Sequence, residues 1–218
     1  MSGIEVFQDM VLTGPASARE ALAAALTKEV VAPWRFDPAG SERAERNALG
    51  DKDILIFERK ASAGIQAARL VLWPRDEGYY VPNITPAENG ELGISLYNRI
   101  LSEFAEPIAK PVARRFGFVV SITSSNQDLD DWLDPEAAIA LRRFSGAANK
   151  STGAGHPMDE RRWFDFIIAV HRSGRRIGTD HLARWLEEVE GWDERSAHKL
   201  AGEFERGMAL LEREAETR

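Results

Sequence analysis

The segment from Asn149 to Arg162 gathers a dense set of chemically active side chains. Its glycines at positions 153 and 155 precede an apolar helical pattern. Backbone amides of a glycine-containing loop that runs into a helix can bind an anion. We therefore predict a candidate site for a phosphate or carboxylate group in this segment. Its polar side chains supply an amide, an ammonium, two hydroxyls, an imidazole, a carboxylate and a guanidinium. The residues are, in the same order, Asn149, Lys150, Ser151, Thr152, His156, Asp159 and Arg162.

Two other interpretations of this segment stay open. His156 and Asp159 could act as a general base and the carboxylate that orients it. The same residue types also make turns and cap helices, so the segment can be only a connection between two helices. It does not match the phosphate-loop pattern G-x-x-x-x-G-K-[ST], and no strand is predicted before it. We assign no catalytic residue.

A second candidate site consists of aromatic residues beside charges. Trp34 lies in a proline-flanked segment without helical or strand periodicity, and Trp132 follows Asp130 and Asp131 in an acidic stretch. Tryptophan next to polar residues is a frequent anchor of protein interfaces. We therefore expect these four residues to contact a partner protein, although packing against a neighbouring helix is the alternative for both tryptophans.

Composition excludes several classes of function. The chain has 218 residues and no cysteine, which rules out disulfides, thiolate nucleophiles and cysteine-bound metals. With only four histidines and no helical histidine pair, we expect no metal ion and no cofactor. The formal net charge of −7 argues against nucleic acid as a partner. No apolar run could span a membrane and no secretion signal is evident, so we predict a cytoplasmic protein.

The first half of the chain mixes strand and helix signals. One helix is predicted from a capping box of Ser17 and Glu20, and a second over residues 93–115 with a kink or break near Glu106 caused by two prolines. Residues 32–51 show no regular pattern. Alternating or apolar runs predict strands over residues 4–12, 53–59, 67–73, 79–84 and 118–122.

From Asp128 onward the patterns are helical only. Helices are predicted from Pro135, Pro157, Leu182 and Asp193, each with an apolar stripe. Strands with two helices followed by helices alone indicate an α+β fold. We expect a mostly antiparallel sheet domain over residues 1–125, a variant of the ferredoxin-like arrangement, and a helical domain of about four helices over residues 126–218 packed on it.

These observations predict a cytoplasmic protein-interaction module without catalytic activity of its own. An inhibitor, an immunity-like protein or a regulatory partner would fit the acidic charge and the aromatic loops. The alternative is a protein or enzyme that binds a small or anionic ligand through segment 149–162. Another protein is the expected partner in the first case, and a small molecule in the second.

Overall fold

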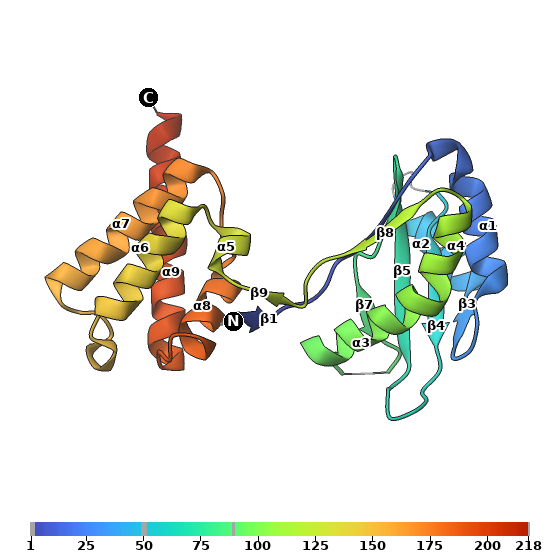
Figure 1. Ribbon diagram of the computed structural model, residues 1–218, viewed down its shortest axis with the longest axis horizontal. Coiled ribbons are helices and arrows are strands. Elements are labelled where there is room, and N and C mark those ends of the chain that lie inside the picture. The colour runs from blue at the N-terminus through green and yellow to red at the C-terminus, as the bar shows by residue number, and fades with distance from the viewer. Residues whose placement is uncertain (1–2, 49–51, 89, 218) are drawn as a thin grey trace. The chain divides into compact units, whose positions relative to one another are not determined.

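A computed structural model describes residues 3–48, 52–88 and 90–217 (Figure 1). The chain divides into two compact units, one formed by residues 6–125 and the other by residues 1–5 together with 126–218. Residues 49–51, which end the segment expected to be irregular, lie outside the described residues. That the helical part packs on the sheet part stays a prediction.

The first unit, which we call the sheet unit, contains an antiparallel sheet. Its described strands follow the order β3-β4-β5-β6-β2-β8, and β7 pairs with part of β5. Their bounds are β2 Met10–Thr13, β3 Trp34–Phe36, β4 Leu55–Arg59, β5 Ala68–Arg75, β6 Gly78–Tyr80, β7 Ile84–Pro86 and β8 Val119–Ile122. The α+β class is confirmed. The ferredoxin-like arrangement stays a prediction, because β6 lies between β5 and β2 and pairs with both of them.

Helices of the sheet unit build its core against the sheet. The helices are α1 (Arg19–Glu29), α2 (Pro38–Asn47), α3 (Ile94–Phe104) and α4 (Lys110–Arg115), and α1 and α4 lie side by side in Figure 1. Apolar residues of α1, α3 and α4 form one buried cluster with those of the strands. A π-helical turn at Ala105–Ala109, with Pro107 inside it, lies where the kink or break is predicted, and helical structure continues through it from α3 into α4.

Local predictions in this unit were wrong in four places. The expected strand over residues 79–84 is two strands, β6 and β7, and Pro82, which has no amide hydrogen to donate, lies between them. The expected strand over residues 4–12 is two strands, because the side chains of Asn98 and Thr123 accept the hydrogen bonds of the Gln8 and Asp9 amides between them. The Ser17 capping box is absent, since a 3-10 turn at Ala16–Ala18 leads into α1 and no side-chain cap is made there. Helix α2 occupies part of the segment expected to be irregular.

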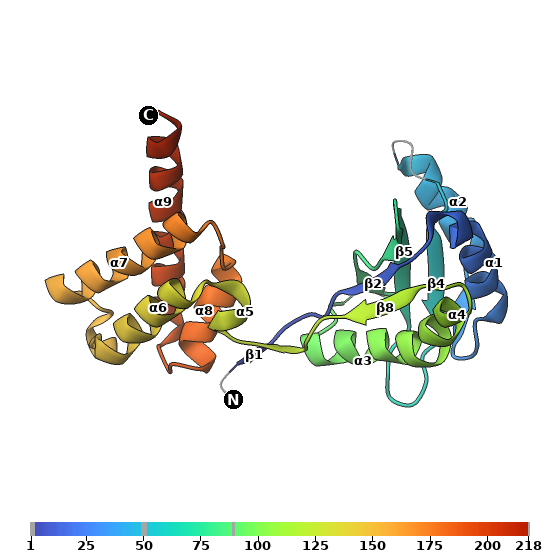
Figure 2. The same cartoon turned by 45° about the horizontal axis from the view of Figure 1, so that its top comes forward.

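The second unit, which we call the helical unit, contains α5 (Leu129–Trp132), α6 (Pro135–Ala147), α7 (Pro157–Ser173), α8 (Thr179–Glu188) and α9 (Glu194–Glu216). Helices α6 and α7 pack together, as do α8 and α9, and α7 also contacts α9 (Figure 2). A chain of ring contacts forms the core between them, through Phe144, Trp163, Trp192, Phe166 and Phe204. The predicted helical segment is confirmed.

The start of the chain completes the helical unit. Strand β1 (Ile4–Glu5) pairs antiparallel with β9 (Asn126–Gln127), and it also packs against α8. The side chain of Ile4 is almost completely buried in this position. Two short strands from distant parts of the sequence therefore close the helical unit, which no local pattern could predict. Among the described residues, none of the helices is long and apolar enough to cross a membrane.

Candidate functional site

The loop between α6 and α7 bonds chiefly to itself. The Oδ1 atom of Asn149 accepts hydrogen bonds from the amide and the hydroxyl of Ser151, at 3.1 and 2.7 Å. The hydroxyl of Thr152 donates to the Asn149 carbonyl at 3.1 Å. These bonds shape a short 3-10 turn, Lys150–Thr152. Asn149, Ser151 and Thr152 thus form a turn, as the interpretation of this segment as a connection between two helices predicts.

The charged residues of the same segment are paired within the helical unit. The Lys150 ammonium donates to the Glu190 carbonyl and lies 3.6 Å from the Glu190 carboxylate. Asp159, which is 4% exposed, pairs with Arg162 at 2.8 Å and accepts from the Asn149 amide. An incoming anion would have to compete with a carboxylate for either cation. This pairing weakens the case for an anion site.

His156 caps a helix. Its Nδ1 atom accepts a hydrogen bond from the Met158 amide at 3.2 Å, in the first turn of α7. A nitrogen that accepts this bond cannot also take a proton from a substrate without losing the cap. The structure does bring five of the seven predicted residues around one open hollow, namely Asn149, Thr152, His156, Asp159 and Arg162, while Lys150 and Ser151 lie outside it.

The predicted interface residues separate in the structure. Trp34 lies in the core of the sheet unit, where its ring meets Phe104 edge-on at 5.1 Å, so it offers almost no surface to a partner. Trp132 is half-buried, donates to Gln127 and stacks on His181 with ring centroids 5.1 Å apart. Both tryptophans therefore make packing contacts within their own units, and Trp132 keeps part of its surface exposed.

The acidic stretch is a local network. Arg142 binds Asp128 and Asp130 at 3.1 and 3.0 Å, and the hydrogen bond from Arg142 lowers the pKa of the Asp130 carboxyl. Asp131 accepts the Asp128 amide in a capping box of α5, and Asp128 accepts the indole N–H of Trp185 at 2.7 Å. Asp130 and Asp131 stay exposed, and they remain the part of the predicted interface that a partner could reach.

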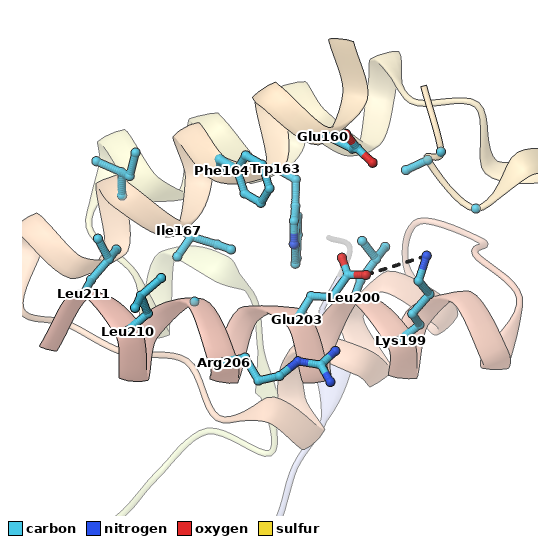
Figure 3. A pocket seen from close by; sticks show the side chains of 15 residues that line it. Glu160, Trp163, Phe164, Ile167, Lys199, Leu200, Glu203, Arg206, Leu210 and Leu211 are labelled. Atoms are coloured by element: carbon cyan, nitrogen blue, oxygen red, sulfur yellow. Dashed lines mark ion pairs between the residues drawn. The ribbon is translucent and has the colours of Figure 1, made fainter. Parts of the chain in front are cut away.

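A groove between α7 and α9 forms a different candidate site, and Figure 3 shows it from close by. Its volume is about 480 Å³, which is within the range of cavities that bind small molecules. Loop residues Gly153–Gly155 form part of one end. The walls are mostly apolar and include Phe164, Ile167, Ile168, Leu200, Leu210 and Leu211. The sequence predicts an apolar stripe on this helix but gives no sign that α9 leaves an opening beside it.

The groove also contains a buried polar atom. Trp163 is 2% exposed and lines the groove, and its indole N–H makes no hydrogen bond with any described residue. Figure 3 shows the ring extending from α7 toward Leu200 and Glu203 of α9. Leaving such a donor unpaired costs about 1–3 kcal/mol, so an acceptor within the groove would be stabilising.

One comparison with known proteins matches the part of the chain that contains most of this groove. A family model described as a domain of unknown function (DUF1889) matches residues 133–210. This region of the chain is similar to that family. The match covers α6 to α8 and most of α9, and it includes both helices that form the groove. Searches among curated proteins and among solved structures found no match.

Other chemistry has little support in the described part of the chain. Within residues 3–48, 52–88 and 90–217, there is no group of three or more histidine, aspartate or glutamate side chains that could hold a metal ion. Two other hollows, beside α2 and beside the loop before α7, are lined mainly by polar or paired residues. Among the described residues, the α7–α9 groove is therefore the strongest candidate for a binding site.

Proposed function

We propose that this chain is a ligand-binding protein whose site is the groove between α7 and α9. The observation that carries the proposal is an apolar groove of about 480 Å³ with one buried, unpaired N–H donor at Trp163. Apolar walls with a few convergent polar groups are typical of small-molecule sites. The loop within the predicted 149–162 segment contributes to this site through Gly153–Gly155 rather than through its charged side chains.

A second candidate keeps the protein-interaction module predicted from the sequence. Phe164 is 57% exposed and Leu210 is 70% exposed, and both lie along the groove. Contiguous exposed apolar side chains of this size frequently mark a surface that a partner covers. In this case the chain would act in the cytoplasm as an inhibitor, an immunity-like protein or a regulatory partner of another protein.

Filling the groove tests the first candidate. A Cβ atom at Gly207 would lie 3.0 Å from the Ile167 side chain, whereas one at Gly202 on the same helix would meet nothing within 4 Å. We expect Gly207→Leu to weaken binding of anilinonaphthalene sulfonate, measured by its fluorescence, by roughly tenfold or more. Gly202→Leu is the matched control and should bind as the wild type does. Equal dye binding by both variants would exclude the groove as the site.

Charge on the rim tests the second candidate. We expect Leu210→Glu to abolish capture of a stoichiometric partner, because a charge would enter the apolar contact. Ile139→Glu is the control, since Ile139 is 63% exposed on α6 and is not among the groove residues. A partner that both variants capture equally binds elsewhere, and charge reversal at Asp130 and Asp131 would then test the acidic stretch.

A further inference from the structure

The two ends of the α7–α9 groove differ in polarity. Figure 3 shows Glu160, Lys199 and Glu203 at one end and Leu210 and Leu211 at the other. Lys199 and Glu203 form an ion pair at 3.6 Å. The groove therefore has a polar end, where water and a polar head group are accommodated, and an apolar end suited to hydrocarbon.

The unpaired donor lies toward the polar end. Three other indoles of the helical unit have acceptors, since Trp132 donates to Gln127, Trp185 to Asp128 and Trp192 to Ser145 at 2.7, 2.7 and 2.8 Å. Trp163 is as deeply buried as Trp185 and Trp192, yet no described residue accepts its N–H. Buried polar groups are normally paired. The Trp34 indole N–H and the Tyr79 hydroxyl of the sheet unit are unpaired in the same way, but Trp163 lines the groove, from which an acceptor would reach it.

The shape of the groove favours a thin occupant. From Leu200 to Leu211 it follows α9 for about 16 Å, at 1.5 Å per residue. Helices α7 and α9 approach closely where Gly207 faces Ile167, because a Cβ atom at Gly207 would lie only 3.0 Å from the Ile167 side chain. A partner helix is about 10–12 Å wide and its backbone oxygens are already bonded, so it would reach the Trp163 N–H only with a side chain. An extended aliphatic chain has the right width and length.

We propose that the groove binds a single-chain amphiphile, with its aliphatic tail toward Leu210 and an oxygen of its head group accepting the Trp163 indole N–H. This inference rests on the ligand-binding function proposed above and names the class of ligand. Two acidic and two basic side chains line the groove, Glu160 and Glu203 with Lys199 and Arg206, so their charges balance. The hydrogen-bond acceptor therefore selects the head group more than its charge does.

Nitrogen-15 NMR of the tryptophan side chains tests the proposal on the whole chain. The probes are decanoate, decanol and decyltrimethylammonium below their micelle concentrations, which share a tail but differ in whether the head group has an acceptor oxygen. We expect decanoate and decanol to shift the Trp163 indole resonance downfield, as a new hydrogen bond does, and decyltrimethylammonium to leave it without that shift. The indoles of Trp185 and Trp192 already have acceptors, and they serve as internal references.

A variant separates the head group from the tail. Trp163→Phe keeps an aromatic ring and removes the donor, so the affinity for decanoate should fall by about tenfold relative to that for decyltrimethylammonium. An unchanged ratio of the two affinities would overturn the proposal even if the variant is less stable. So would equal indole shifts with all three probes on the wild type.

The two proposals fail in different ways. Binding of all three probes with no preference for an acceptor oxygen would leave the groove as a ligand site and refute the role of the Trp163 N–H. Absence of binding by every probe, together with equal dye binding by Gly207→Leu and Gly202→Leu, would refute both. A groove occupied instead by a partner protein would appear as capture that is lost in Leu210→Glu while no amphiphile binds.

Discussion

Arg59 offers the sharpest test of what stabilises the sheet unit. Its side chain is completely buried, and its guanidinium pairs with the Glu103 carboxylate of α3. It also donates to the Ile65 carbonyl and to the Ser62 hydroxyl, both at 3.1 Å, and to further carbonyls of the same loop, the nearest being that of Lys60 at 2.9 Å. One buried cation therefore holds the connection between β4 and β5 against helix α3.

Replacing Arg59 with methionine keeps an unbranched apolar chain and removes all of these donors. The Ile65 carbonyl is buried and would lose its side-chain donor, and the Glu103 carboxylate, whose side chain is 30% exposed, would lose its cation. Breaking a buried ion pair costs about 3–5 kcal/mol, and partial hydration of Glu103 places the expected loss near the lower end, at about 3 kcal/mol. That is a large fraction of the stability of a typical domain.

Arg69→Met is the matched control, because Arg69 lies on the neighbouring strand β5 and pairs with Glu58 while its side chain is 48% exposed. An exposed pair contributes less than about 1 kcal/mol. Urea denaturation followed by circular dichroism measures both variants, and hydrogen exchange assigns the change to residues 60–67. If Arg59→Met costs no more than Arg69→Met, the buried pair does not stabilise this unit as argued.

Three further predictions concern the helical unit. Burial lowers the pKa of His181 in the folded chain; the charge of Arg184 lowers it further, and that of Asp180 opposes the shift. As the pH falls, the unfolded chain therefore binds a proton at this imidazole before the folded chain does. Stability should therefore fall as the pH drops below about 6.5, and His181→Phe should lose that part of the pH dependence in urea titrations. Ile4→Ala should cost about 2–4 kcal/mol and raise hydrogen exchange in α8, and unchanged exchange would contradict the role of β1. Gly202→Ala should stabilise α9 by about 1 kcal/mol, because alanine favours a helix more than glycine does. Gly207→Ala should stabilise it by less, because the added Cβ atom crowds Ile167, and thermal unfolding would detect the difference between the two variants.

Helix starts illustrate how far local chemistry could be predicted. Asp193 and Pro135 were expected to begin helices, and they stand at the starts of α9 and α6. The same signal at Asp37 and Pro38 begins α2, where Asp37 accepts the Gly40 amide at 3.0 Å. That helix was missed because its few apolar residues give no stripe, and it buries only Gly40 and Ser41. The sequence contains the cap of α2, but without an apolar stripe the segment was predicted to be irregular.

The segment predicted as a candidate site shows what residue types and spacing cannot predict. Segment 149–162 was selected because its side chains can do chemistry, and the structure uses several of them to make a turn, a cap and internal ion pairs. A pairing such as Lys150 with Glu190 depends on how helices pack 40 residues apart in sequence. No spacing rule within the segment could distinguish a free ammonium from one that is already bound.

The α+β class, the position of the irregular turn after α3 and the helical character of the segment α6–α9 follow from residue type and spacing, because propensity, caps and amphipathic periodicity act over a few neighbouring residues. The pairing of β1 with β9, the burial of Arg59 against Glu103 and the opening between α7 and α9 depend on tertiary packing. Phe164 and Leu210 are ordinary apolar helix residues in the sequence. Only the angle and separation at which α7 and α9 meet leave them exposed beside an unpaired indole, and those are properties of the whole helical unit.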